Sequence, residues 1–211
     1  LKSDQVKKLD KIAKRNKKLL FVDYPFLFSG SINYIKKIIE SKKFGNLKEV
    51  ESFREQAPVR NDADVVWDLG VHDISILKYL LNDDPKIIKS KKYKTIKTSK
   101  SDTAYINLQY KKNIKVFIKN SWLSPLKIRL IKLKFDNAII YCDENEPIYK
   151  IKIYTINKKS NHLYNISIPD IDITEPLYNL VKYINKCLKT KKNTIYKKNF
   201  NFTLTKVLER I

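Results

Sequence analysis

The sequence predicts an α+β fold in which a large, mostly antiparallel, open β-sheet carries helices on one face. Three observations predict it. Apolar residues recur at helical spacing toward both ends of the chain, and between residues 86 and 168 the hydrophobic pattern changes to period two. Roughly six alternating stretches follow one another there, joined by short polar turns, as is typical of antiparallel sheets.

The first segment is predicted to be the last helix and strand of a truncated Rossmann-like α/β domain. Residues 3–17 show helical spacing of apolar side chains behind Ser3, and the short apolar run 19–22 indicates a buried strand. We therefore expect two parts: residues 1–24 as the tail of a dinucleotide-binding domain, and residues 25–211 as a domain for substrate binding and oligomerisation.

In the second part, helices and a strand are predicted to alternate before the main run of strands begins. Helices are expected at about 31–42 and 67–81, and two more close the chain at about 174–189 and 203–211. A first strand is expected at 50–54. The remaining strands are expected at 104–109, 114–118, 128–135, 138–141, 148–154 and 163–168.

The net charge of +22 raises the question of nucleic acid as a partner. The excess is almost entirely lysine, spread along the whole chain, whereas base and phosphate recognition favour arginine. Arginine occurs only at residues 15, 54, 60, 129 and 210. With no recognition motif beside this charge, we expect no specific nucleic-acid partner and interpret the lysines as solvated surface.

The composition also indicates the cellular compartment and whether a targeting signal is present. No run of eighteen apolar residues occurs, so no membrane partner is expected, and the charged start does not resemble a secretory signal. Cys142 and Cys187 lie far apart without metal-ligand spacing, which favours a reducing cytoplasm and no metal site. The chain lacks methionine, so we expect a segment that precedes Leu1.

Asp68 and His72 form the most informative pair of polar residues. They stand four apart in a predicted helix, so both are expected on one face, one turn from each other. A carboxylate at that position can orient the imidazole and favour its protonated form, as a general acid or base requires. The spacing is equally compatible with a helix-face ion pair or a histidine satisfied in the core.

The order of these segments resembles the Gfo/Idh/MocA family of dehydrogenases. The resemblance rests on three features. A strand ends in the segment 21–28, and a helix at 35–41, followed by Gly45, has the family's pattern of residues. The D-x-x-x-H element then runs from Asp68 to His72. The later blocks resemble a subgroup linked to nucleotide sugars and surface polysaccharides; they lie at 121–129, 140–144, 147–154, 169 and 175–177.

This resemblance implies roles for five residues. His72 would be the acid/base at a sugar hydroxyl, with Asp68 as its partner and a substrate contact. Tyr24 would contact the substrate from the hinge, and Lys127 and Arg129 could reach an anionic substrate such as a diphosphate. Tyr24 could equally be a strand-end aromatic, and the two cations could belong to a solvated strand face.

The cofactor implied by the resemblance is NAD or NADP, yet the glycine-rich turn that binds a dinucleotide is missing. That turn needs three closely spaced glycines after a strand. Only Gly30, Gly45 and Gly70 occur here, and none has that spacing. The family's Glu-Lys-Pro element is also missing. We therefore expect this chain alone to bind NAD(P) poorly and to be inactive, as a fragment or a decayed homologue, with its cofactor-binding residues unknown.

Three functions are considered. The first is an NAD(P)-dependent oxidoreductase that acts on a hydroxyl or carbonyl of a sugar or nucleotide sugar and forms a homo-oligomer through its sheet. The second is a non-catalytic oligomerisation or sugar-binding module derived from such an enzyme. A nucleic-acid-binding protein is a third reading, supported by charge alone.

Overall fold

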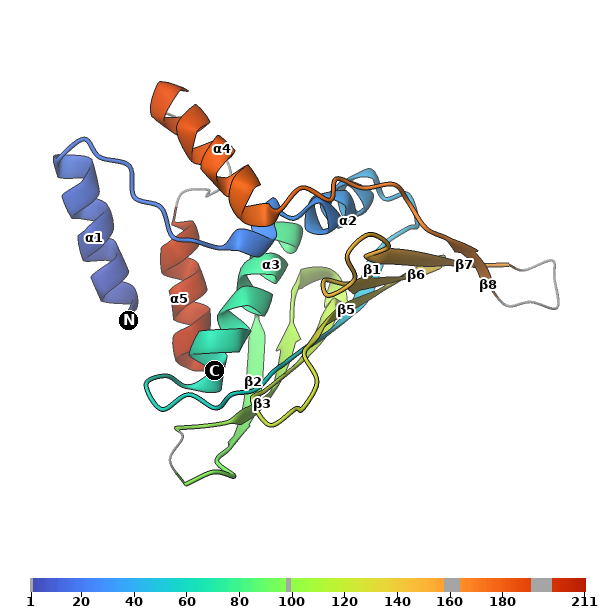
Figure 1. Ribbon diagram of the computed structural model, residues 1–211, viewed down its shortest axis with the longest axis horizontal. Helices are drawn as coiled ribbons and strands as arrows, with labels where there is room; N and C mark the ends of the chain where they lie inside the picture. Colours follow the sequence, from blue (N-terminus) through green and yellow to red (C-terminus); the bar gives the residue numbers. More distant parts are fainter. Residues whose placement is uncertain (1, 98–99, 158–163, 191–198) are drawn as a thin grey trace.

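One eight-stranded sheet organises the protein in the computed structural model, which describes residues 2–97, 100–157, 164–190 and 199–211 (Figure 1). Its strand order is β2-β3-β4-β1-β5-β6-β7-β8. All neighbouring strands are antiparallel except β1 and β4, which run parallel at the centre. The strands are β1 (Leu47–Glu55), β2 (Ile87–Tyr93), β3 (Thr103–Gln109), β4 (Lys115–Ser121), β5 (Ile128–Phe135), β6 (Ala138–Asp143), β7 (Ile151–Ile156) and β8 (Tyr164–Ser167).

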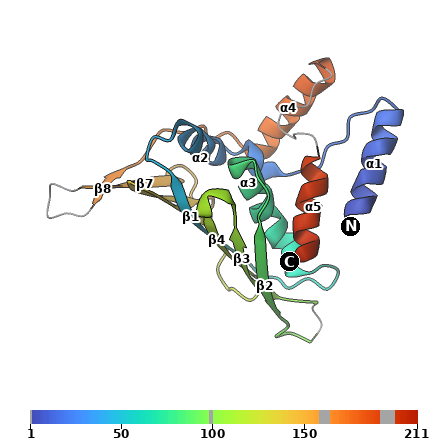
Figure 2. The same cartoon turned by 180° about the vertical axis from the view of Figure 1, so that it is seen from behind.

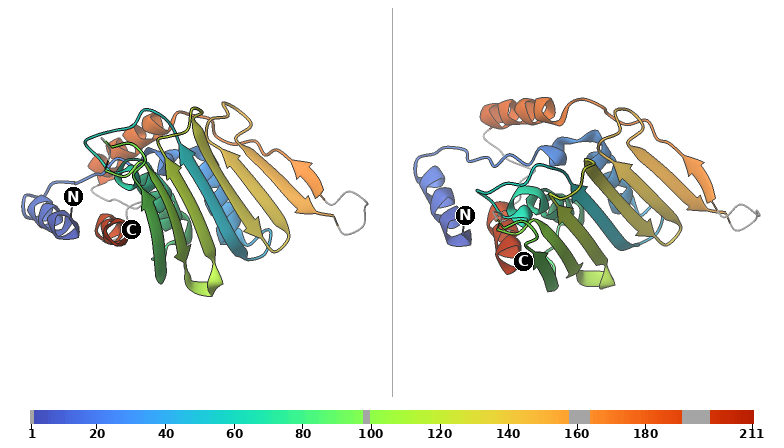
Figure 3. Two further views of the ribbon diagram at one scale, coloured as in Figure 1. Left: turned by 90° about the horizontal axis from the view of Figure 1, so that it is seen from below. Right: turned by 60° about the horizontal axis from the view of Figure 1, so that its bottom comes forward.

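The helices gather on one face of this sheet and leave the other face bare, as Figures 2 and 3 show. Short 3₁₀ turns lie at η1 (Pro25–Phe28) and η3 (Lys111–Asn113), and a π-helical turn lies at η2 (Val66–Gly70). The helices are α1 (Ser3–Arg15), α2 (Gly30–Ser41), α3 (Val71–Leu81), α4 (Pro176–Thr190) and α5 (Phe200–Arg210).

The core lies between the sheet and helices α2, α3 and α5. Every second strand residue points into it, as the period-two pattern requires. On the helices, residues three and four apart face the sheet. Each large apolar side chain buried there contributes about 1.5–3 kcal/mol. The fully buried members include Ile32, Ile35, Ile74, Leu80, Ile106, Ile118, Leu133 and Ile140.

The α+β class and the mostly antiparallel open sheet predicted from the sequence are confirmed. The predicted helices, and the predicted strands other than the one at 19–22, are found with shifted ends; residue 163, the first of one predicted strand, lies outside the described residues. The structure adds β2, which the sequence did not single out because it is a lysine-rich, largely exposed edge strand. At such an edge, alternation between apolar and polar residues is weak.

The strand predicted at residues 19–22 is wrong. This segment is extended but pairs with none of the eight strands. Its apolar side chains are explained by helix packing, because the Phe21 ring contacts Tyr183 of α4 edge-on at 6.5 Å. Helix α1 before it lies beside α5 (Figure 1). The domain boundary at residue 24 stays a prediction.

None of the helices in the described ranges is long and apolar enough to cross a bilayer.

Candidate functional site

His72 lies in the first turn of α3, directly after the π-helical turn η2. The half-buried imidazole packs edge-on against the Phe26 ring, with 5.1 Å between ring centres. Its Nδ1 atom is buried and has no hydrogen-bond partner among the described residues. A buried ring nitrogen without a partner is costly in a fold unless a bound molecule or water satisfies it.

The start of α3 lies unusually close to the sheet because residue 70 is glycine. A Cβ at Gly70 would come within 2.7 Å of Asn120 Oδ1 on β4. The Val71 N–H bonds to the carbonyl of Val66, which gives the wide π-helical turn. Such turns inside helices are frequent at functional sites. Gly70 therefore sets how closely the start of α3, which carries His72, approaches the central strand β4.

The pKa of His72 is lowered to about 4, chiefly by burial and next by the nearby Arg54 guanidinium. The smaller effects on this pKa are, in decreasing order, those of Asp73, which raises it, Arg129, which lowers it, and Asp68, which raises it. The two carboxylates together do not offset the desolvation. Asp68 therefore favours the protonated imidazole, as the sequence suggests, but it is the smallest of these causes, and burial with Arg54 outweighs it. With a pKa of about 4, His72 is neutral near pH 7.

Asp68 is engaged away from the imidazole. Its Oδ1 accepts a hydrogen bond from Arg60 Nη1 at 3.1 Å, and its Oδ2 accepts one from Trp122 Nε1 at 3.0 Å. The carboxylate lies in the π-helical turn, partly exposed, rather than one regular α-turn ahead of His72. The role of Asp68 as a partner of His72 stays a prediction, and these contacts show that Trp122 and Arg60 orient it.

Beneath the imidazole lies a buried polar network centred on Asp73. Its Oδ1 accepts hydrogen bonds from Arg54 Nε at 3.1 Å and from Ser52 Oγ at 2.9 Å, and its Oδ2 accepts one from Asn120 Nδ2 at 2.8 Å. The side chains of Arg54 and Asp73 are 3% and 0% exposed. The Arg54 guanidinium lies 4.3 Å from the centre of the Phe26 ring. This network thus supports the ring that His72 contacts.

Sequence reasoning missed Phe26, Arg54, Asp73 and Trp122. One signal was available for Asp73: it falls beside Ile74 and Leu77 in the inward stripe of a helix, where a carboxylate needs a buried partner. Arg54 occupies an inward position of β1 in the same way. Nothing in the sequence indicates which of these charges meet.

Arg129 lies on β5 directly opposite Arg54 of β1. Its guanidinium also faces Phe26, at 5.4 Å from the ring centre, and its Nη2 lies 3.5 Å from Gln56 Oε1. The Nε atom is buried without a hydrogen-bond partner in the described part of the chain. Burial lowers the pKa of Arg129, as does Arg54, whereas Glu144 raises it.

Tyr24 and Lys127 are placed differently. Tyr24 is 5% exposed, its ring centre lies 5.8 Å from that of Phe200, and burial raises its pKa to about 12. Lys127 is exposed in the β4–β5 connection, where its carbonyl accepts a hydrogen bond from Asn145 Nδ2 at 2.7 Å. The structure brings Asp68, His72 and Arg129 around one region, with Tyr24 packed in the core and Lys127 at the surface. The substrate contacts predicted for all of them stay predictions.

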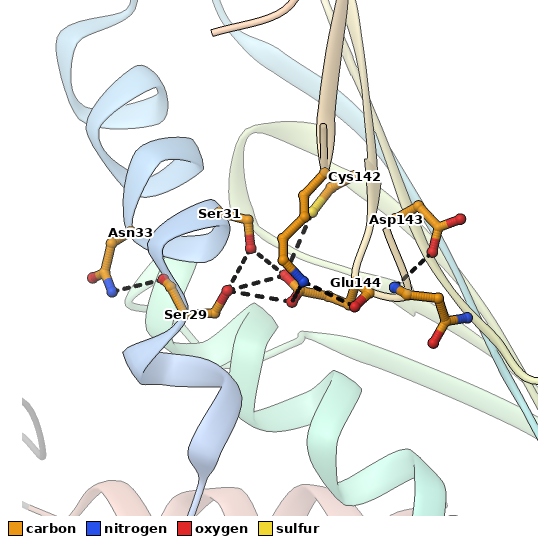
Figure 4. Close-up of polar contacts among 8 residues, drawn as sticks. Ser29, Ser31, Asn33, Cys142, Asp143 and Glu144 are labelled. Atoms are coloured by element: carbon orange, nitrogen blue, oxygen red, sulfur yellow. Dashed lines mark hydrogen bonds and ion pairs between the residues drawn. The ribbon is translucent and has the colours of Figure 1, made fainter. Parts of the chain in front are cut away.

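Glu144 follows β6 and points toward the start of α2 (Figure 4). Its side chain is 4% exposed. The carboxylate accepts hydrogen bonds from the hydroxyls of Ser29 and Ser31 and lies 3.7 Å from Lys150 Nζ. Burial and this carboxylate raise the pKa of the neighbouring Cys142 thiol. The group therefore ties α2 to the end of β6.

The chain is thus an α+β domain in which helices cover one face of an open sheet and His72 lies at the start of α3. Residues 32–144 match the GFO/IDH/MocA C-terminal domain family. This match covers more than half of the chain, so the chain belongs to that family.

Solved structures share this fold at low sequence identity. UDP-N-acetylglucosamine 3-dehydrogenase GnnA from Acidithiobacillus ferrooxidans superposes with a TM-score of 0.83 at 14% identity, over 100% of this chain and 66% of that one. An NAD-binding protein from Listeria innocua gives 0.83 at 18% identity, over 100% and 65%.

An oxidoreductase from Agrobacterium radiobacter, in complex with NAD+, L-tartaric acid and magnesium, gives a TM-score of 0.78 at 14% identity over 99% and 66%. The chain thus spans about two thirds of the length of these proteins, and the likeness shows the fold. No curated protein sequence matches the chain.

Proposed function

We propose that this chain is the substrate-binding and catalytic portion of an NAD(P)-dependent oxidoreductase that acts on a hydroxyl or carbonyl of a sugar or nucleotide sugar. The observation that carries the proposal is the unpartnered, neutral imidazole of His72 at the start of α3. In oxidation it accepts the proton of the substrate hydroxyl; in reduction the imidazolium returns that proton to the carbonyl oxygen.

The residues around His72 support this proton transfer. Phe26 contacts the imidazole edge-on, and Arg54, which lies against the Phe26 ring, helps to keep the imidazole unprotonated before the substrate binds. Asp68, fixed by Trp122 and Arg60, supplies an acceptor for a second substrate hydroxyl. These groups orient the substrate, and the nicotinamide, when bound, supplies the chemistry of hydride transfer.

The described residues offer no cradle for the phosphates of the dinucleotide. Gly30 approaches the backbone of Asp172, Gly45 lies against the Asp136 side chain, and Gly70 lies against β4. None of these glycines opens a phosphate-binding turn after a strand. The phosphates would be bound by residues outside this chain. The side chains of this chain would handle the proton and orient the substrate.

Several features agree with the proposal. Two solved structures of the same fold are an NAD-binding protein and a complex with NAD+, and a third is a dehydrogenase of UDP-N-acetylglucosamine. Cys142 and Cys187 are both buried free thiols, which fits the reducing cytoplasm proposed as its compartment.

The test is turnover by the full-length protein that contains this chain, assayed with NAD+ or NADP+ and a panel of sugars and nucleotide sugars. His72→Gln removes the proton acceptor while it keeps a polar side chain of similar size. We expect it to lose at least about a hundredfold in kcat, the usual scale of general acid–base catalysis. Circular dichroism checks that it stays folded. If kcat stays within a few-fold of wild type, His72 is not the acid/base.

An assembly role is the second candidate, and the bare face of the sheet favours it (Figure 3). Four aromatic rings form a row across β2, β3, β4 and β1, with neighbouring centres 5.9, 6.3 and 6.1 Å apart; they are Tyr93, Tyr105, Phe117 and Phe53. A homo-oligomer would bury this row. Phe117→Lys should sediment as a smaller species, whereas Ile12→Lys on exposed α1 should not. An unchanged sedimentation coefficient of Phe117→Lys contradicts this interface.

A further inference from the structure

We propose that Arg129 binds a carboxylate of the substrate, and that this carboxylate belongs to the same sugar unit as the hydroxyl served by His72. The substrate class is then a sugar acid. This inference rests on the proposed function and deepens it. It stands on the pairing of charges around Phe26, where one cation is left without an anionic partner.

The arginines of this region differ in their partners. Arg54 forms a buried ion pair with Asp73 at 3.1 Å. Arg60 pairs with Asp62 at 2.7 Å and with Asp68 at 3.1 Å. Arg129 has no ion pair within the described ranges, and its Nε is buried without a hydrogen bond. A half-buried guanidinium with an unused donor is a binding group for an oxyanion.

The nearest acid does not fill this role. Glu144 follows β6 beside Arg129, and its backbone N–H donates to the Arg129 carbonyl at 2.9 Å. Its carboxylate, however, turns toward Ser29 and Ser31, as Figure 4 shows, and lies 3.7 Å from Lys150 Nζ. The attraction of Glu144 for Arg129 therefore acts through space, and among the described residues the guanidinium makes one side-chain hydrogen bond, from Nη2 to Gln56 Oε1 at 3.5 Å.

The positions of His72 and Arg129 indicate that the carboxylate and the reacting hydroxyl belong to one sugar unit. His72 and Arg129 both contact Phe26, the imidazole edge-on at 5.1 Å and the guanidinium at 5.4 Å from the ring centre. Arg129 also lies near enough to His72 to lower its pKa, so we infer that one sugar-sized ligand contacts both groups. A diphosphate carries two charges and would need a second free cation there, but Arg54 is neutralised by Asp73. One planar fork matches one planar carboxylate bidentately.

Binding by this chain tests the proposal without hydride transfer. The probes are D-glucuronate and its neutral analogue D-glucuronamide, titrated calorimetrically, with inorganic phosphate as a competitor. We expect glucuronate to bind wild type at least about tenfold more tightly than glucuronamide. Arg129→Gln should remove this preference. Arg129→Lys should retain part of it, because it keeps the charge and loses the fork. Lys134→Gln, an equal loss of charge from an exposed position on β5, should change nothing.

Equal binding of the two probes to wild type overturns the proposal, as does a preference that survives in Arg129→Gln or the absence of measurable glucuronate binding. Phosphate that displaces glucuronate at equal concentration shows a general oxyanion site and overturns the assignment to a sugar acid. His72→Gln separates the two proposals. If it binds glucuronate and the full-length wild type does not turn over any sugar, the proposed function fails and the carboxylate site stands.

Discussion

His72 and Asp73 are neighbours in the chain, yet their side chains meet opposite environments. The His72 imidazole contacts Phe26 and leaves its buried Nδ1 without a partner among the described residues. The Asp73 carboxylate accepts hydrogen bonds from Arg54, Ser52 and Asn120 in the interior. One helical turn therefore carries both the proposed proton acceptor and the carboxylate that anchors the helix to the sheet.

The free energy of unfolding should fall as the pH is lowered toward 5. The pKa of His72 is about 4 in the folded protein against 6.5 in the unfolded chain, chiefly because burial disfavours the imidazolium. Between these values the unfolded chain binds the proton and the folded protein does not. Acid therefore favours unfolding, by about 2 kcal/mol between pH 7 and pH 5. Urea unfolding across this range measures it.

The carboxylates also titrate at the lower end of this range, so the control is His72→Asn measured under the same conditions. The difference between the two proteins isolates the histidine. The variant should lose the part of the slope that lies between about pH 6.5 and pH 5. Parallel curves for the two proteins would mean that His72 titrates normally and is open to water.

Asp73→Ala should destabilise the fold severely. It leaves the buried Arg54 guanidinium without its carboxylate and Asn120 without its acceptor, and breaking a buried pair costs about 3–5 kcal/mol. The midpoint of urea unfolding measures the loss. The double variant Arg54→Met/Asp73→Leu removes both charges and should be more stable than Asp73→Ala. If the double variant is the less stable one, the uncompensated charge is not the cause.

The sheet could be predicted because each core strand alternates strongly. In β3 and β4 the inward residues Ile106 and Ile118 are fully buried, and their neighbours Tyr105 and Lys119 face away from the helices. The edge strand β2 lacks this contrast, since water covers most of it. Periodicity reports burial, so it finds central strands and overlooks an exposed edge.

The candidate site could be predicted only in part. The spacing of Asp68 and His72 directs attention to the start of α3, and the resemblance adds Arg129; the roles of all three stay predictions. The charge state of the imidazole could not be predicted, because its pKa depends on burial and on Arg54, which lies on a strand eighteen residues earlier in the chain. Contacts between side chains distant in sequence, such as Arg54 with Phe26, leave no periodic signal.

Gly70→Ala should destabilise the protein and disturb the site together. The added Cβ would lie 2.7 Å from Asn120 Oδ1, so α3 or β4 must shift. Overpacking of this kind costs about 1–3 kcal/mol. Asn120→Ser shortens the opposing side chain, so the double variant should lose less than the sum of the two single losses. Additive losses in urea unfolding would contradict the close contact.

Glu144→Gln should destabilise the contact between α2 and the end of β6. The buried carboxylate accepts hydrogen bonds from Ser29 and Ser31 and attracts Lys150, and these weaken when its charge is removed. Charge-assisted hydrogen bonds exceed neutral ones by about 1 kcal/mol each, so we expect a loss of about 1–2 kcal/mol in urea unfolding.

The same substitution leaves Arg129 with less negative charge nearby. Glucuronate should therefore bind Glu144→Gln as tightly as wild type or somewhat more tightly, although the fold is weaker. Glu49→Gln on β1 makes the same chemical change outside this cluster, at a position with no ion pair in the described part of the chain, and should affect neither quantity. Weaker glucuronate binding by folded Glu144→Gln would show that Glu144 holds Arg129 in place rather than competing with the ligand for it.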